Sequence, residues 1–218
     1  MKQTDPANAK TPPATRRRAA RLSPDERKRQ LAEAALLVLA EEGLGHTNHS
    51  MVAARAGVSL PTMLHYYPQH ADLVDTVLDG VADFLLNGIA GRVAATVGDP
   101  ALATEEMLVA FALSIETNQD MVRVWLDWST ATRHSTWPKY LAFRTNACAI
   151  VARLLRRGQA EGVIHAALVV DEAAQVVVGL AHMTAQMYFT GSSPGQIRRA
   201  VHELLEGYLR SKRLPAAG

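Results

Sequence analysis

The chain has 218 residues, of which 48% are hydrophobic and 20% charged, values that are ordinary for a globular protein. Its single cysteine, Cys148, excludes an internal disulfide and a cysteine-based zinc cluster, and no apolar run approaches the ~20 residues of a membrane span. The N-terminus lacks the apolar stretch of a secretory signal, so we expect a cytoplasmic protein without a membrane partner.

The net charge of +2 is unevenly distributed along the chain. Asp25 and Glu26 are the only acidic residues between positions 10 and 29, and that stretch carries a charge of +6. A basic end on a mildly acidic body is typical of a protein that meets a polyanion, although an isolated basic run is about as often a solvated tail. Its eight basic residues are Lys10, Arg16, Arg17, Arg18, Arg21, Arg27, Lys28 and Arg29.

Residues 1–21 are rich in Pro, Ala, Thr and Arg and have no apolar periodicity, so we expect a disordered basic arm. A helix is predicted to follow it, because Ser23 and Glu26 have the spacing of a capping box and Pro24 suits a first turn. Apolar residues then recur at helical spacing until Gly43.

Two shorter helices are predicted next, from about Ser50 to Ala56 and from Ser59 to about Pro68. With Ser59 as the N-cap, Pro61 lies in the first turn, where its missing N–H has no intrahelical partner. The short turn between the two helices predicts a helix-turn-helix, with Val58 filling the space between them.

The rest of the chain is also predicted to be helical, so the expected fold class is all-α. The helices are expected at about 71–97, 100–117, 120–133, 137–161, 171–190 and from 194 onward, the last beginning with a second capping box at Ser193 and Gln196. We expect three parts: the arm (1–21), a three-helix helix-turn-helix domain (22–68) and a C-terminal ligand-binding and dimerisation domain (69–218).

The sequence contains no enzyme signature that we can identify, and we expect no cofactor. His46 and His49 could share a metal ion, but no acidic or sulfur ligand is close in the sequence, so a metal site is not predicted.

The third helix is the candidate DNA-reading element. Such a short helix can enter a major groove about 12 Å wide, where Thr62 could contact a base while His65 and Tyr66 donate to phosphates. Tyr67 is expected to pack in the core instead. The predicted DNA-binding residues are Arg16, Arg17, Arg18, Arg21, Ser59, Leu60, Pro61, Thr62, His65 and Tyr66.

Several segments carry a resemblance to a known family. The stretches "LAEAALLVLAEEGLG", "VAARAGVSLPTMLHYYP" and "ADLVDTVL" resemble the DNA-binding domain of the TetR family of transcriptional regulators. The stretch "VWLDWSTATRHSTWPKYLA" (124–142) and the arm ending "RLSP" are similar to the LuxR/HapR/SmcR group within that family. The resemblance implies a minor-groove role for Arg18 and Arg21, while Leu60, Pro61, His65 and Arg144 depart from the group's pattern.

Large aromatic and methionine side chains gather in the C-terminal half. They indicate either ordinary core, which is the more frequent role for any single residue, or the lining of a pocket for a small apolar effector. The predicted pocket residues are Trp125, Trp128, Tyr140, Arg144, Met183 and Met187. The last two helices have wide apolar faces that suggest a dimeric four-helix bundle, formed by Val176, Val177, Leu180, Ala181, Leu204, Leu205 and Tyr208.

Together these features predict a homodimeric regulator, a repressor or an activator, that binds a pseudo-palindromic operator in double-stranded DNA. A narrower alternative is a local repressor of an efflux or catabolic operon. The alternative from another class is an all-α enzyme or adaptor that does not bind DNA.

Overall fold

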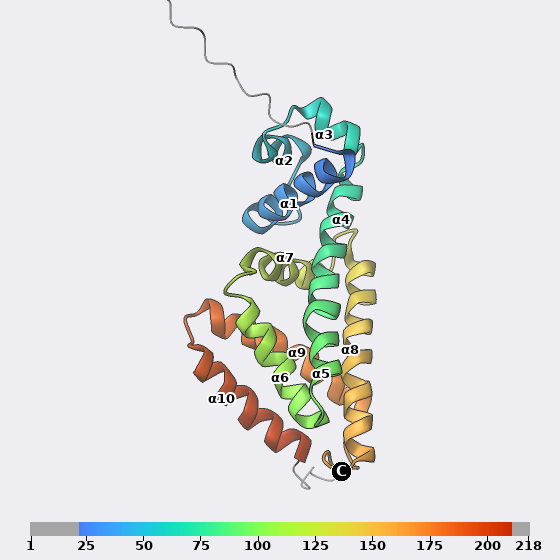
Figure 1. Ribbon diagram of the computed structural model, residues 1–218, viewed down its shortest axis with the longest axis vertical. Coiled ribbons are helices and arrows are strands. Elements are labelled where there is room, and N and C mark those ends of the chain that lie inside the picture. Colours follow the sequence, from blue (N-terminus) through green and yellow to red (C-terminus); the bar gives the residue numbers. More distant parts are fainter. Residues whose placement is uncertain (1–21, 211–218) are drawn as a thin grey trace, which may run out of the picture.

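The computed structural model describes residues 22–210, and every regular element in that range is helical (Figure 1). The all-α prediction is therefore confirmed. In chain order the elements are α1 (Pro24–Glu42), α2 (His49–Ala56), α3 (Leu60–Tyr66), α4 (His70–Asp83), the π-helix η1 (Phe84–Gly91), α5 (Arg92–Thr96), α6 (Pro100–Ser114), α7 (Gln119–Thr130), α8 (Trp137–Ala160), α9 (Val170–Phe189), α10 (Pro194–Leu205) and the π-helix η2 (Glu206–Arg210).

The helix starts follow the capping signals in the sequence. At α1 the Ser23 N–H donates to a Glu26 carboxylate oxygen at 2.7 Å, and the Glu26 N–H donates to the Ser23 hydroxyl at 3.2 Å. Ser193 and Gln196 form the same reciprocal pair at α10. At α3 the Ser59 hydroxyl accepts from the Thr62 N–H, and Pro61 lies in the first turn as predicted.

The predicted helix 71–97 is continuous, but its middle is wider than an α-helix. Residues 84–91 form a π-helical segment between α4 and α5. Two glycines weaken the α-helical preference here, and a Cβ on Gly91 would lie 3.0 Å from the carbonyl oxygen of Leu86, five residues earlier. Apolar periodicity does not distinguish the two helix types, which is why the sequence did not reveal this segment.

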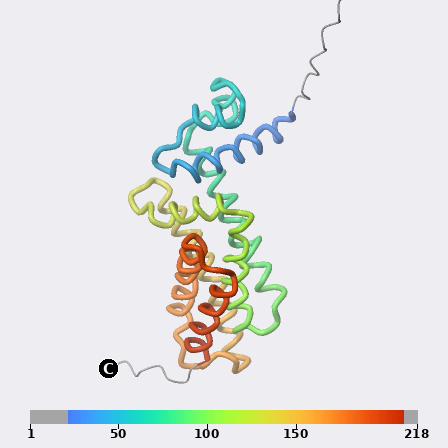
Figure 2. The backbone as a smooth tube through the Cα atoms, turned by 90° about the vertical axis from the view of Figure 1, so that its left-hand side faces the viewer, coloured from blue at the N-terminus to red at the C-terminus, as the bar shows by residue number. Residues whose placement is uncertain are grey.

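The helices form an elongated molecule with α1, α2 and α3 at one end (Figure 1). The continuous helix from α4 to α5 runs from that end into the body, beside α8. Both views place α7 directly beneath α1 (Figures 1 and 2), and the two helices are in contact. The remaining body is formed by α6, α8, α9 and α10. None of the helices within residues 22–210 is both long and apolar enough to cross a membrane.

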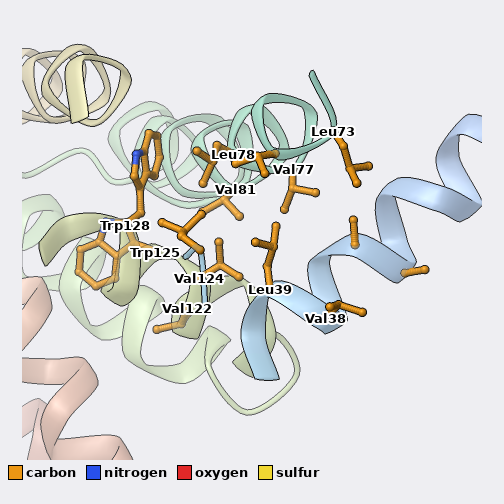
Figure 3. Close-up of a cluster of buried hydrophobic side chains, with 14 of the residues drawn as sticks. Val38, Leu39, Leu73, Val77, Leu78, Val81, Val122, Val124, Trp125 and Trp128 are labelled. Carbon is orange, nitrogen blue, oxygen red and sulfur yellow. The ribbon is translucent and has the colours of Figure 1, made fainter. Parts of the chain in front are cut away.

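One hydrophobic core extends from the helix-turn-helix end into the body. Figure 3 shows Leu39 of α1 facing Val77 and Val81 of α4, with Val124 of α7 completing the contact. The same cluster continues through buried side chains of α2, α3, α6, α7 and α8, which include Val52, Met63, Phe111, Trp128, Tyr140 and Phe143. A second cluster fills the lower body between α6, α8, α9 and α10. The core therefore does not stop at the predicted domain boundary after Pro68.

Candidate nucleic-acid interface and internal cavity

Helices α2 and α3 form a helix-turn-helix whose turn is held by specific hydrogen bonds. Gly57 has φ +66°, a left-handed conformation that favours glycine, and the Val58 N–H donates to the Ala53 carbonyl at 3.0 Å. The Gln30 side chain of α1 donates to the Ala56 carbonyl at 3.1 Å. Half-buried Val58 packs against the core, as its place in the turn predicted.

The orientation of α3 is set by two buried side chains. Met63 is fully buried and Tyr67 is 6% exposed, so these two residues fix the inner face of the helix. The expectation that Tyr67 packs in the core is confirmed. Because Met63 faces inward, the opposite face of α3 points away from the protein.

The predicted DNA-binding residues of this element lie on or beside the outer face. Ser59, Leu60, Pro61 and His65 are exposed, whereas Thr62 and Tyr66 are half-buried. The predicted set omitted Leu64, which is 40% exposed and lies four residues after Leu60 on the same face. The spacing of the two leucines was a signal for it. Arg16, Arg17, Arg18 and Arg21, also predicted to contact DNA, lie outside the described residues.

The charge of the helix-turn-helix end differs from that of the arm. Residues 22–68 carry four basic and five acidic residues, a charge of −1. Two of the four cations are paired within this end, Arg29 with Glu33 and Arg55 with Glu41. The basic character of the N-terminal region therefore comes from positions before residue 22.

The histidines considered as metal ligands have other surroundings. His46 is exposed, and a ring nitrogen of His49 lies 2.9 Å from the Tyr67 carbonyl oxygen. Within residues 22–210 no group of three or more His, Cys, Asp or Glu side chains is arranged to hold a metal ion.

Asp127 of α7 joins the helix-turn-helix end to the body by a hydrogen bond. Its carboxylate accepts from the Leu44 N–H at 2.7 Å, just after Gly43 ends α1. This backbone group lies beyond the last turn of the helix and is half-buried, so the carboxylate satisfies a donor that water reaches poorly.

Asp127→Ala is expected to lower the free energy of unfolding by about 1–3 kcal/mol, because it leaves the Leu44 N–H without its acceptor. Urea unfolding followed by tryptophan fluorescence measures the change. Asp127→Asn is the matched control, since it keeps a side-chain oxygen acceptor and should retain most of the stability. An alanine variant as stable as the wild type would show that the hydrogen bond contributes nothing.

The body contains an apolar cavity of about 80 Å³. Its wall combines η1 with helices α6, α7, α8 and α9, and no charged side chain lines it. The lining residues are Leu85, Leu86, Ile89, Ala90, Met107, Leu108, Phe111, Trp125, Tyr140, Phe143, Ala147, Val151, Val177, Val178 and Ala181. The cavity is smaller than the roughly 150 Å³ apolar cavity that accommodates benzene in another protein.

Trp125 and Tyr140, both predicted to line a pocket, lie in this wall. The Trp125 ring packs edge-on against Phe111, with 5.3 Å between ring centroids, and lies tilted against the His182 ring, with 4.2 Å between centroids. Burial lowers the pKa of His182, which favours the neutral imidazole beside the indole. Burial likewise raises the pKa of Tyr140, so its phenol stays protonated.

The four other predicted pocket residues are not part of the wall. Trp128 is fully buried core, and its indole N–H donates to the Thr136 carbonyl at 3.1 Å. Arg144 bonds Gln175 on the outer surface, because one residue after Phe143 the helix has turned by about 100°. Met183 and Met187 follow the wall residue Ala181 by two and six residues, which turns both onto other faces of α9.

The predicted dimer residues are also divided between two environments. Val176 and Leu204 are 45% and 46% exposed, and Leu180 and Tyr208 are half-buried. Val177 and Ala181 line the cavity, and Leu205 is buried in the lower core, so these three contribute to packing within the chain. The apolar faces of the last two helices are wide because they cover this internal core as well.

Comparison with known proteins gives both sequence and fold relatives. No protein-family model matches the chain. The HTH-type transcriptional regulator LuxR of Vibrio harveyi is 37% identical over 130 residues, which cover 58% of this chain and 62% of LuxR. The chain thus matches less than two thirds of that relative's length.

Solved structures extend the likeness over most of the chain. The fatty acid degradation regulator FadR from Bacillus halodurans has a TM-score of 0.72 at 19% identity, covering 85% of this chain and 97% of that one. A TetR-like transcriptional regulator from Rhodococcus sp. RHA1 has a TM-score of 0.70 at 17% identity, covering 86% and 97%. FadR from Bacillus subtilis, in complex with stearoyl-CoA, has a TM-score of 0.69 at 16% identity, covering 83% and 97%. The fold is therefore TetR-like.

Proposed function

We propose that this chain is a TetR-family transcriptional regulator of the LuxR-like group, which binds a pseudo-palindromic DNA operator as a homodimer. The observation that carries the proposal is the helix-turn-helix, in which Met63 anchors α3 and turns its opposite face outward. The sequence relative and the fold relatives named above are transcriptional regulators and not enzymes, which supports this class of function.

The division of charge supports a mechanism with two kinds of DNA contact. The exposed face of α3 is nearly neutral and would read base edges in the major groove. The arginines before residue 22 would supply the attraction to phosphates, which residues 22–68 with a charge of −1 do not provide.

The proposed homodimer rests on an apolar stripe along α9. Val176, Leu180, Met183 and Met187 are spaced four, three and four residues apart, so they share one side of the helix. All four are exposed or half-buried in the isolated chain. A second copy packing on this stripe would place two α3 helices at a fixed separation, as a pseudo-palindromic operator requires.

We further propose that the cavity takes a small, uncharged, mostly apolar effector. A charged molecule would find no counter-ion among the lining residues. Residues Leu85, Leu86 and Ile89 of the wall belong to the same continuous helix whose first part, α4, packs against α1. A molecule that fits one arrangement of this helix better than another would shift DNA affinity by that difference in binding free energy.

A gel-shift assay with the DNA upstream of the protein's own coding sequence tests the proposal. Retention of the labelled fragment in excess random competitor DNA is expected, with two copies of the chain per fragment by sedimentation analysis. Equal displacement by random and specific competitor would contradict sequence-specific regulation. Binding of one copy would contradict the dimer alone.

Tyr66→Phe is expected to weaken binding by about tenfold on every operator variant alike, because a contact to phosphate carries no base information. Tyr66 is half-buried and packs against the core, so its ring is held in place at the edge of α3. Fluorescence anisotropy on a panel of operator variants measures the effect. Tyr67→Phe, at the buried neighbour, is the matched control and should leave affinity unchanged. A changed ranking of the variants in Tyr66→Phe would show that Tyr66 reads bases.

A further inference from the structure

The outer face of α3 lacks the side chains that most often read bases. Leu60–Tyr66 contains no Arg, Lys, Asn, Gln, Asp or Glu. Bidentate contacts of Arg or Lys with guanine, and of Asn or Gln with adenine, are the common direct readings in the major groove. This helix can make none of them.

The hydroxyl groups at the start of the helix are engaged with each other. The Thr62 hydroxyl lies 2.8 Å from the Ser59 hydroxyl, which also accepts from the Thr62 N–H at 3.3 Å. The His65 ring packs edge-on against Tyr66, with 5.1 Å between the ring centroids. The polar groups of α3 are thus few, and two of them already have partners.

Two leucines dominate what the helix presents instead. Leu60 and Leu64 are each 40% exposed, and their spacing of four residues places them on one side of α3, next to exposed Pro61. This exposed apolar strip runs along one flank of α3, beside Pro61 and His65, which lie opposite buried Met63, and it indicates a contact surface.

We propose that Leu60 and Leu64 determine specificity by packing against the 5-methyl groups of thymines. The thymine methyl is the apolar group that base edges offer in the major groove, so it is the chemical complement of this strip. The preferred operator half-site then contains thymines at the positions that face the two leucines. This inference rests on the proposed function, because it requires α3 to lie in the major groove.

The distribution of charge around this strip favours duplex DNA as the molecule that packs on it. Helix α1 belongs to the same end of the molecule as α3 and begins within the stretch from residue 10 to residue 29, which has a charge of +6. That stretch would hold a polyanion against this end of the molecule, whereas it would repel a second copy of the same end.

Replacement of thymine by deoxyuridine tests the proposal, because it removes the methyl group alone. The full chain is used to select preferred duplexes from a random-sequence library, and each thymine of the selected half-site is replaced in turn. Loss of one buried methyl group should weaken wild-type binding about fourfold in one half-site and about fifteenfold in both.

The leucine variants connect each effect to a residue. Leu60→Ala should abolish the preference for thymine over deoxyuridine at the operator position that faces Leu60 and keep it at the position that faces Leu64. Leu64→Ala should have the reverse effect. Leu37→Ala is the matched control, since Leu37 is 37% exposed on α1, and it should keep both preferences. Circular dichroism verifies that each variant is folded.

The outcomes separate this inference from the function on which it rests. Tight, sequence-selective binding with equal affinity for thymine and deoxyuridine at every position would overturn the role of the leucines and leave the proposed function standing. Leucine variants that keep the preference for thymine over deoxyuridine would likewise overturn the role of the leucines and leave the proposed function standing. A shift from dimer to monomer in either leucine variant would identify the strip as a contact between copies. Failure of the library to yield any preferred duplex would overturn both.

Discussion

Trp128→Ala is expected to lower the free energy of unfolding by about 3–5 kcal/mol, the largest stability effect that we predict for a single substitution. Trp128 is fully buried, and its ring contacts Tyr140 and Phe143, each at 5.5 Å between centroids. Truncation would open a large void at this point and leave the Thr136 carbonyl without its donor. Urea unfolding followed by far-ultraviolet circular dichroism measures the loss without relying on tryptophan signals.

Trp125→Ala is the variant with which the loss of stability in Trp128→Ala is compared. Trp125 lies on the same helix and is 3% exposed, but it borders the cavity and so already lacks neighbours on part of its surface. Its truncation should cost clearly less than that of Trp128. Equal losses for the two variants would contradict the distinction between core and cavity wall, and with it the effector site that we propose.

Removal of residues 1–21 is expected to give the largest effect on DNA affinity. The deletion takes away Lys2, Lys10, Arg16, Arg17, Arg18 and Arg21. If about half of them touch phosphate, the slope of log affinity against log salt should fall by roughly 3, at ~0.9 per contact, and affinity near 0.15 M salt by about a hundredfold. Anisotropy titrations over a series of salt concentrations measure both quantities.

A shorter deletion is the control for this prediction. Residues 2–9 contain one Lys and one Asp, so their removal changes the length of the arm without changing its net charge. Salt dependence should then match that of the wild type. An unchanged slope after removal of all 21 residues would show that the basic stretch does not meet the phosphates.

Much of the fold could be predicted because its signals are local. Ser23, Ser59 and Ser193 cap helices with their own neighbours, and Pro61 is tolerated through its place in a first turn. These interactions span three or four residues, so they are visible in the sequence without knowledge of the tertiary structure.

The cavity wall could be predicted only in part, because it depends on how helices are rotated against one another. Trp125 and Trp128 lie three residues apart on α7, yet the first borders the cavity and the second is fully buried against the rings of Tyr140 and Phe143 on α8. The aromatic composition of α7 indicates that both tryptophans are buried, but it does not indicate which of them lies beside the cavity. Leu64 was missed for a related reason, since an apolar residue in a short helix is first expected in the core.

The shared core has a consequence for how this protein can be altered. Since Leu39 of α1 packs against α4 and α7, the helix-turn-helix end is not a separable module (Figure 3). A chimera that joins it to the body of another regulator would have to carry matching surfaces on both of those helices, together with an acceptor for the Leu44 N–H. Changes of operator preference are therefore easier to make by substitution on the outer face of α3 than by exchange of the whole end.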